Sequence, residues 1–152
     1  YIDKSHSKIH FEKLKQIWGG REVLLIEGEK SRLGIGNDLF EHATSVQRIL
    51  APMHHAFSSY KDLLQEVIKH TKSKLVLIAL GPTATALAFD LTQLGYQAID
   101  IGNVDIEYEW FIRGVKSRVK ISGKYTSEAI NGRDVDDIEN KEYSIQIIRQ
   151  IK

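Results

Sequence analysis

Short apolar runs, rich in Val, Leu and Ile, recur along this chain and are separated by polar or glycine-containing segments. Continuous apolar runs of this length are typical of strands that are buried on both faces of a parallel sheet. We predict strands at 22–27, 45–50, 74–80 and 97–101.

Apolar residues at helical spacing occupy much of the chain between these runs. They predict helices at 1–20, 39–43, 60–71 and 82–94, and residues 108–112 fit a further short helical segment. Residues 142–151 fit either an alternating strand or a short helix. Strands that alternate with helices predict an α/β fold with a mostly parallel sheet and helices on both of its faces.

The composition fits one globular domain. The chain has 152 residues, of which 42% are hydrophobic and 27% charged. Its net charge of +1 gives no reason to expect a nucleic-acid partner. The absence of cysteine fits a cytoplasmic protein, and no apolar run reaches the length of a membrane span.

We expect a single domain over 1–152 with three parts. A leading helix spans 1–20, an α/β core spans 21–114, and a charged extension with a terminal element spans 115–152. The extension has little apolar periodicity and predicts a long loop. A solvated surface is the default interpretation, and a lid over the site is the alternative.

A glycine-rich loop follows the first predicted strand. Gly34 and Gly36 let the backbone approach a ligand, Arg32 suits phosphate oxygens, and Asn37 or Asp38 can cap the next helix. A strand, a glycine loop and a helix N-terminus together favour phosphate binding. The loop matches neither the G-x-G-x-x-G fingerprint nor a P-loop, and a purely structural loop explains the glycines about as well.

A second turn of this kind, Gly81-Pro82-Thr83, follows the third predicted strand. Glycine leaves room at the strand end, proline suits a first helical turn, and threonine offers a hydroxyl. We interpret the turn as another cradle for a phosphate or a sugar, and an ordinary capped helix is the alternative.

Two acids, Asp105 and Glu107, follow the fourth predicted strand. In extended chain, residues two apart point to the same side, so this pair could share one divalent cation. A solvated acidic loop is the alternative. Because ligands bind at the carboxyl ends of parallel strands, the two turns and the acidic pair are expected at one edge of the sheet. A cation near phosphate-binding turns indicates chemistry on a diphosphate.

Three stretches, at 27–40, 77–91 and 95–110, together resemble the bacterial GT-D-type glycosyltransferases that act on glycans of serine-rich-repeat adhesins. The resemblance covers roughly residues 10–114. It implies a Rossmann-like fold, a Mn²⁺ or Mg²⁺ ion on the D-x-E motif formed by Asp105 and Glu107, and UDP-glucose or a similar UDP-sugar as donor.

The chain departs from the family pattern in two ways. Asn103 stands where a histidine often precedes the D-x-E motif, so the role of that position is open here. The family's domain also carries an earlier strand and loop, and we therefore expect this chain to be the C-terminal portion of that domain.

The expected function is metal-dependent transfer of a hexose from a UDP-sugar to a glycan on a glycoprotein acceptor. We expect the hexose to be glucose. Glu29 is the candidate catalytic base. The expected donor-binding residues are Arg32, Gly34, Gly36, Asn37, Asp38, Gly81, Pro82 and Thr83. The alternatives are a metal-dependent phosphohydrolase of nucleotides or sugar phosphates and a non-catalytic nucleotide-binding module.

Overall fold

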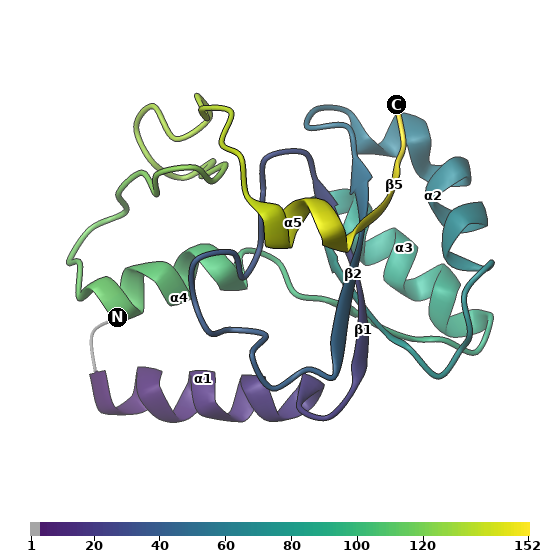
Figure 1. The fold of residues 1–152 in the computed structure, drawn as a ribbon, viewed down its shortest axis with the longest axis horizontal. Helices are drawn as coiled ribbons and strands as arrows, with labels where there is room; N and C mark the ends of the chain where they lie inside the picture. The colour runs from purple at the N-terminus through teal and green to yellow at the C-terminus, as the bar shows by residue number, and fades with distance from the viewer. Residues whose placement is uncertain (1–3) are drawn as a thin grey trace.

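Five parallel strands form one sheet in the computed structural model, which describes residues 4–152 (Figure 1). The strand order is β4-β3-β1-β2-β5. The strands are β1 (Glu22–Gly28), β2 (Ser45–Ala51), β3 (Leu75–Ala79), β4 (Gln97–Asp100) and β5 (Ile147–Gln150). The predicted α/β fold with a parallel sheet is confirmed.

The centre of the sheet is β1, which pairs with β2 on one side and β3 on the other. All of its residues except Glu22 are buried. This explains the unbroken apolar run in the sequence, because a strand covered on both faces has no exposed side that would favour alternating polar residues.

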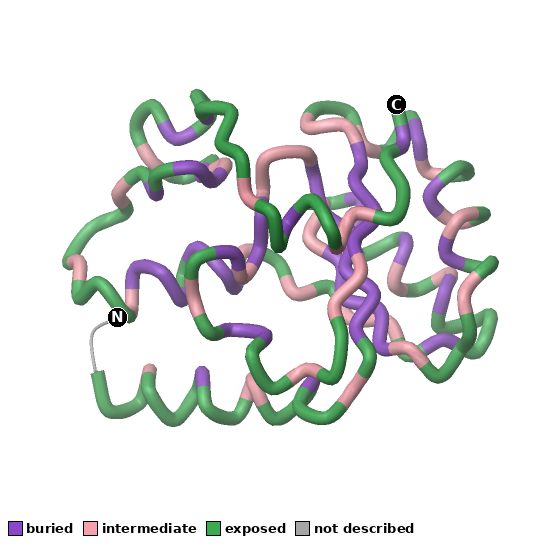
Figure 2. Tube along the Cα trace, in the orientation of Figure 1, coloured by how far each residue is buried: buried purple, intermediate pink, exposed green. Residues whose placement is uncertain are grey.

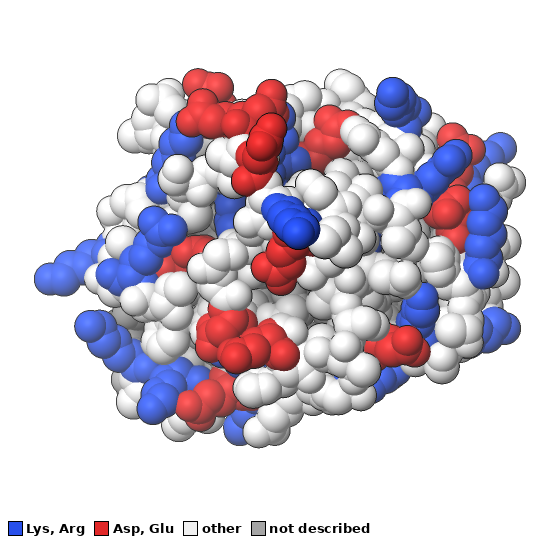
Figure 3. Space-filling model, viewed as in Figure 1, with Lys and Arg blue, Asp and Glu red and all other residues white. Residues whose placement is uncertain are grey.

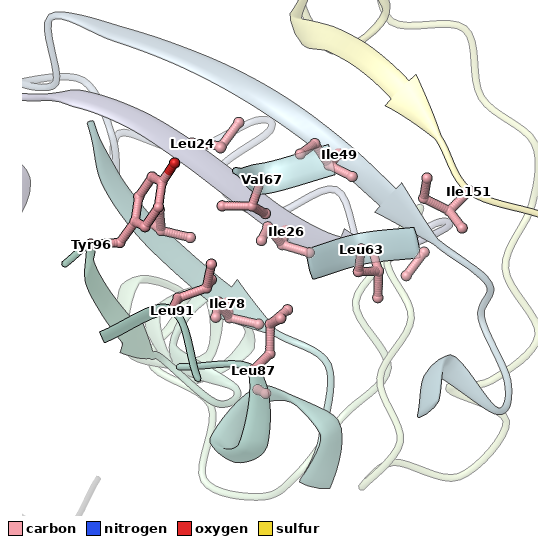
Figure 4. Close-up of a cluster of buried hydrophobic side chains, with 13 residues drawn as sticks. Leu24, Ile26, Ile49, Leu63, Val67, Ile78, Leu87, Leu91, Tyr96 and Ile151 are labelled. Atoms are coloured by element: carbon pink, nitrogen blue, oxygen red, sulfur yellow. The ribbon is translucent and has the colours of Figure 1, made fainter. Parts of the chain in front are cut away.

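Helices cover both faces of the sheet, as predicted. On one face, α2 (Tyr60–Val67) and α3 (Pro82–Gln93) pack on the strands through a core that includes Ile26, Val67 and Leu87 (Figure 4). On the other face, α1 (Lys4–Trp18) and α4 (Val104–Arg113) enclose a second core. The short elements η1 (Ala56–Ser59) and α5 (Lys141–Gln146) precede α2 and β5.

Burial follows the sheet: β1, β3 and the second half of β2 are almost wholly buried, whereas the edge strands β4 and β5 contain no buried residue (Figure 2). Basic and acidic side chains are interspersed over the face shown in Figure 3. No helix within residues 4–152 is long and apolar enough to cross a membrane.

The predicted helix at 39–43 is wrong. Residues 29–44 instead form successive turns, in which Glu41 and Ala43 bond to carbonyls only three residues back. Leu39 is fully buried, and its carbonyl accepts a 2.7 Å hydrogen bond from the indole of Trp18. Packing of this loop on α1 therefore outweighs the local preference for a helix, and no helix N-terminus follows the glycine loop.

Other boundaries differ less. Helix α2 ends at Val67 rather than at residue 71, and α4 begins at Val104, four residues before the predicted segment. The two interpretations of 142–151 are both correct in part, because this segment forms α5 and then β5, which pairs with β2.

The charged extension folds back onto the domain. Residues 114–140 contain no helix or strand, as predicted, but Ile121, Lys124 and Thr126 are buried. The Tyr125 amide donates to the Lys30 carbonyl at 3.0 Å, which joins the extension to the loop after β1. The default interpretation of a solvated surface is thus wrong for this part, because backbone hydrogen bonds and buried side chains hold it in place.

The loop after β1 offers a matched pair of glycines, Gly34 and Gly36, which have φ angles of 75° and 81°. A Cβ on Gly34 would lie 2.4 Å from the Phe40 ring, whereas a Cβ on Gly36 would meet no atom within 4 Å. Both alanine variants bear a backbone cost of about 1–2 kcal/mol. Gly34→Ala adds overpacking of about 1–3 kcal/mol. Denaturant unfolding should show the larger loss for Gly34→Ala, and equal losses would contradict this packing.

Candidate functional site

A cavity of about 670 Å³ lies at the carboxyl ends of the strands. This volume is within the range of small-molecule sites. Its walls come from the ends of β1 and β3, the turns after β2 and β4, η1, the first turns of α3 and α4, and the extension. The lining residues are Gly28, Ser31, Leu33, Pro52, Met53, His55, Ala56, Phe57, Ala79, Leu80, Gly81, Pro82, Thr83, Gly102, Asn103, Asp105, Ile106, Tyr125, Ser127 and Glu128.

The position of the cavity follows from the topology. From β1 the chain runs to β2 on one side, and then crosses to β3 on the other. The segments that leave β1 and β3 therefore separate at the sheet edge, and such a switch point opens a crevice where ligands of α/β proteins bind. The predicted placement of the site at this edge fits the cavity that is observed.

The turn after β3 lies in the cavity wall, as expected for Gly81, Pro82 and Thr83. Gly81 caps α3 with φ 55° and ψ −140°, a conformation that non-glycine residues rarely adopt. The first turn of this 12-residue helix carries no acidic residue. Its N–H groups and the positive end of its dipole are therefore not neutralised by a side chain of that turn, which suits an anion in the cavity.

The glycine-loop residues that are predicted to bind the UDP-sugar contact other parts of the chain instead. Arg32 is buried, and its Nη1 donates to the carbonyls of Gly123 (2.8 Å) and Asp136 (3.1 Å) in the extension. The Asp38 carboxylate accepts hydrogen bonds from Lys15 (2.9 Å) and the Tyr108 hydroxyl. Neither side chain lines the cavity. Both residues hold the loop against its neighbours.

Gly34 and Asn37 instead bind the predicted metal ligand. The Gly34 amide and the Asn37 Nδ2 donate to Oδ1 of Asp105 at 2.8 and 2.9 Å. Gly36 is also absent from the cavity wall. The glycine loop therefore contacts the acidic segment, and only its first part, Gly28 to Leu33, contributes to the cavity.

Asp105 lies at the centre of a buried cluster of charges. Its Oδ2 is 2.7 Å from the ammonium group of Lys124, which also lies 3.3 Å from Glu109. Asn37 donates to both carboxylates. The side chains of Lys124, Asp105 and Glu109 are 5%, 2% and 5% exposed, so the two acids are neutralised mainly by this lysine and by Arg113.

The expected geometry of the D-x-E pair is wrong. Asp105 and Glu107 lie in the first turn of α4 rather than in extended chain. Residues two apart on a helix project about 200° apart around its axis. Asp105 accordingly lines the cavity and is buried, whereas Glu107 is exposed and absent from the wall. The helical partner of Asp105 is Glu109, four residues on.

These residues do not fit a Mn²⁺ or Mg²⁺ ion held between Asp105 and Glu107. The two carboxylates diverge, and both oxygens of Asp105 already accept hydrogen bonds. Within residues 4–152, no group of three or more His, Asp or Glu side chains is placed to hold a metal. The positive charge beside Asp105 is the Lys124 ammonium group.

Glu29, the candidate base, also has a different environment. Its carboxylate accepts a hydrogen bond from Gln150 at the end of β5, and it is absent from the cavity wall. Glu128, in the extension, is exposed and lines the cavity.

Sequence reasoning missed the cavity residues from η1 and the extension, among them Phe57, Tyr125 and Glu128. Tyr125 and Glu128 lie in a segment without periodicity, so no local pattern marks them. Phe57 is not marked either, because it stands three residues before Tyr60 and seven before Leu64, a helical spacing that predicts a core position. His54 and Tyr125 meet edge to face, with ring centroids 6.4 Å apart.

Removal of the Lys124 ammonium group should destabilise the fold. In Lys124→Ala, Asp105 and Glu109 lose a buried counter-charge, which typically costs about 3–5 kcal/mol. Lys120→Ala, at an exposed position of the same segment, is the matched control and should change stability by less than about 0.5 kcal/mol. Urea denaturation measures both, and similar stabilities for the two variants would contradict the structural role of Lys124.

The same cluster predicts a pH dependence. Burial alone would raise the pKa of Glu109, but the hydrogen bond from Asn37 and the charges of Lys124 and Arg113 hold the pKa below its ordinary value of 4.5. Ionised Glu109 therefore stabilises the fold above that value, and the contribution is lost as the pH falls through the lower, folded-state pKa.

Unfolding free energies of the natural chain and Glu109→Gln, compared from about pH 7 to about pH 3, test this contribution. The difference should be largest near neutral pH and should shrink below 4.5. A difference that is independent of pH would show that the charge of Glu109 does not stabilise the fold.

Comparisons with known proteins agree with this architecture. A family model described as the glycosyltransferase GT-D fold matches residues 1–129. Over 151 residues the chain is 47% identical to glycosyltransferase GlyD of Streptococcus pneumoniae serotype 4, covering 99% of this chain and 19% of that protein. Over 149 residues it is 42% identical to the probable glycosyl transferase Gly of Streptococcus gordonii, covering 98% of this chain and 22% of that protein. The chain thus spans about a fifth of these curated relatives.

Solved structures show the same fold. One, of the highly conserved domain of unknown function 1792, is described as having a distinct glycosyltransferase fold and matches with a TM-score of 0.94 and 44% identity. Another, described as a new glycosyltransferase from Streptococcus sanguinis, matches with a TM-score of 0.93 and 42% identity. The chain covers 55% and 56% of these two structures, and 99% of the chain is matched in each. Since the family model also matches most of its residues, the chain belongs to the glycosyltransferases of the GT-D fold.

Proposed function

We propose that this chain forms the UDP-sugar-binding part of a glycosyltransferase. The enzyme transfers a hexose, which we expect to be glucose, from a UDP-sugar to a glycan on a glycoprotein. The observation that carries the proposal is the cavity at the switch point of the sheet, with the N-terminus of α3 in its wall. Its volume of about 670 Å³ can hold a ligand of this size. Membership of the glycosyltransferase family supports the reaction class.

The diphosphate of the donor belongs at the first turn of α3. Gly81 and Pro82 are exposed in the cavity wall, and Thr83 adds a hydroxyl there. The two helix N-termini at the cavity differ, because α4 carries two acids in its first turn and α3 carries none. An anion is therefore favoured at α3 and opposed at α4.

The hexose then belongs near the start of α4. Asn103 and Asp105 line that part of the cavity. The half-buried Asn103 amide can donate to and accept from sugar hydroxyls, whereas both oxygens of Asp105 already accept hydrogen bonds within the chain. Glu128 is the exposed carboxylate of the wall, and we assign it the removal of the acceptor hydroxyl proton in place of Glu29.

We keep the expected Mn²⁺ or Mg²⁺ ion in the proposal only with Asp105 as its ligand. Of the two predicted ligands, Asp105 alone lines the cavity. A cation bound there would compete with the Lys124 ammonium group for the same carboxylate. Each proposed role above is performed by side chains and backbone groups of the chain itself.

Pro82→Asp tests the assignment of the diphosphate. A carboxylate at the first helical position is compatible with the dipole, so the variant should fold. The new charge faces the donor phosphates and should weaken binding of UDP and UDP-glucose by about tenfold or more. Pro82→Ala is the matched control and should bind within about threefold of the natural chain. Titration calorimetry with and without Mn²⁺ gives the affinities and shows whether the ion contributes.

The same samples separate the alternatives. Binding of UDP-glucose followed by sugar transfer to a glycan supports the proposal. Phosphate release without transfer would indicate a phosphohydrolase, and binding without turnover a nucleotide-binding module. If neither UDP nor UDP-glucose binds the natural chain with or without Mn²⁺, the proposed donor site is wrong.

A further inference from the structure

A phenylalanine side chain stands largely free in the wall of the cavity. Phe57, in η1, lines the cavity and is nevertheless 67% exposed. It belongs to neither of the two main hydrophobic cores. An aromatic side chain that leaves this much apolar surface in water contributes little to folding, and its position at a cavity points to a contact with a ligand.

The Phe57 ring packs against a second aromatic side chain. Phe57 packs on Tyr60, with ring centroids 5.4 Å apart and an angle of 35° between the planes. The Tyr60 hydroxyl donates to the carboxylate of Asp90 and lies 3.1 Å from the carbonyl oxygen of Ala86. Burial and the bond to Asp90 raise the pKa of Tyr60 to about 12, so this hydroxyl remains a donor at ordinary pH.

This support connects Phe57 to α3. Asp90 and Ala86 both belong to that helix, whose first turn lies in the same cavity wall. The Phe57 ring is thereby held in a fixed position relative to the first turn of α3, to which we assign the binding of the diphosphate. A surface that is positioned before the ligand arrives loses less entropy on binding than a mobile side chain does.

The cavity wall differs from one segment to another. Residues 52–57 contribute four apolar side chains, of Pro52, Met53, Ala56 and Phe57, and one polar side chain, of His55. The segments after β3 and β4 contribute the polar side chains of Thr83, Asn103 and Asp105, next to the apolar ones of Leu80, Pro82 and Ile106. A nucleotide sugar has matching parts: the base has two flat apolar faces, whereas the diphosphate and the hexose present oxygens throughout.

We propose that Phe57 stacks on the nucleobase of the donor, with the turn 52–57 as the base-binding part of the cavity. The inference rests on the proposed function and extends it to a residue that no motif of the chain marks. Stacking is tolerant of base identity because every base has an aromatic face. Phe57 therefore supplies affinity for nucleotides in general, and the choice among bases must come from other contacts.

Phe57→Ala tests this assignment by titration calorimetry with UMP, UDP and UDP-glucose. Loss of a stacking contact should raise the dissociation constants of all three ligands by a similar factor, about 5- to 100-fold. Phe57→Trp retains an aromatic face and should restore binding. The matched control is Phe89→Ala: Phe89 lies on α3, is 64% exposed and is absent from the cavity wall, so its removal should leave all three affinities within about twofold.

Two results would overturn the assignment. Equal affinities of Phe57→Ala and the natural chain for UMP and UDP would show that the ring does not contact the base. A loss confined to UDP-glucose would place the hexose, rather than the base, on Phe57. If the natural chain binds none of these ligands, the proposed function itself fails, and this outcome is distinct from a failure at Phe57.

Discussion

The buried ion pair between Asp105 and Lys124 is the interaction on which the arrangement of the site depends. A carboxylate that is only 2% exposed is stable in its charged form only if its charge is compensated. Compensation of Asp105, on helix α4, comes from two segments that are distant in sequence: the glycine loop through the Gly34 amide and Asn37, and the extension through Lys124. Contacts that neutralise one buried charge thus hold the glycine loop, α4 and the extension together at one edge of the sheet.

A second buried pair attaches the C-terminal part of the chain to the same region. Arg48 of β2 bonds to Glu27 of β1 at 2.5 Å, to the Leu33 carbonyl at 2.7 Å and to Gln146 of α5 at 2.7 Å. Its guanidinium group also lies over the ring of Tyr143, at 5.2 Å. These contacts explain how the short helix α5 remains docked on the sheet, because it supplies partners to a charge that the sheet itself buries. The four-residue strand β5 is held by its parallel pairing with β2.

The cavity has two kinds of surface, one polar and one apolar, and the two have different physical origins. The polar surface follows in part from backbone geometry, since the first turn of α3 has neither a side-chain cap nor an acidic residue at the sheet edge. Apolar surface comes from residues 52–57, between β2 and α2, where Phe57 is 67% exposed. The nucleotide sugar that we propose as donor has a charged part and a flat apolar part, which correspond to these two surfaces.

Much of the fold could be read from local pattern. The apolar runs predict four of the five strands, and the turn Gly81-Pro82-Thr83 lies in the cavity wall because it directly follows a predicted strand. Asp105 and Glu107 were assigned to one side because extended chain was assumed, and the early start of α4 separates them. The burial of Lys124, the turns that replace a helix at 39–43, and the presence of Phe57 and Glu128 in the cavity depend on contacts between distant segments. Such contacts leave no periodicity in the sequence, so only the tertiary structure decided them.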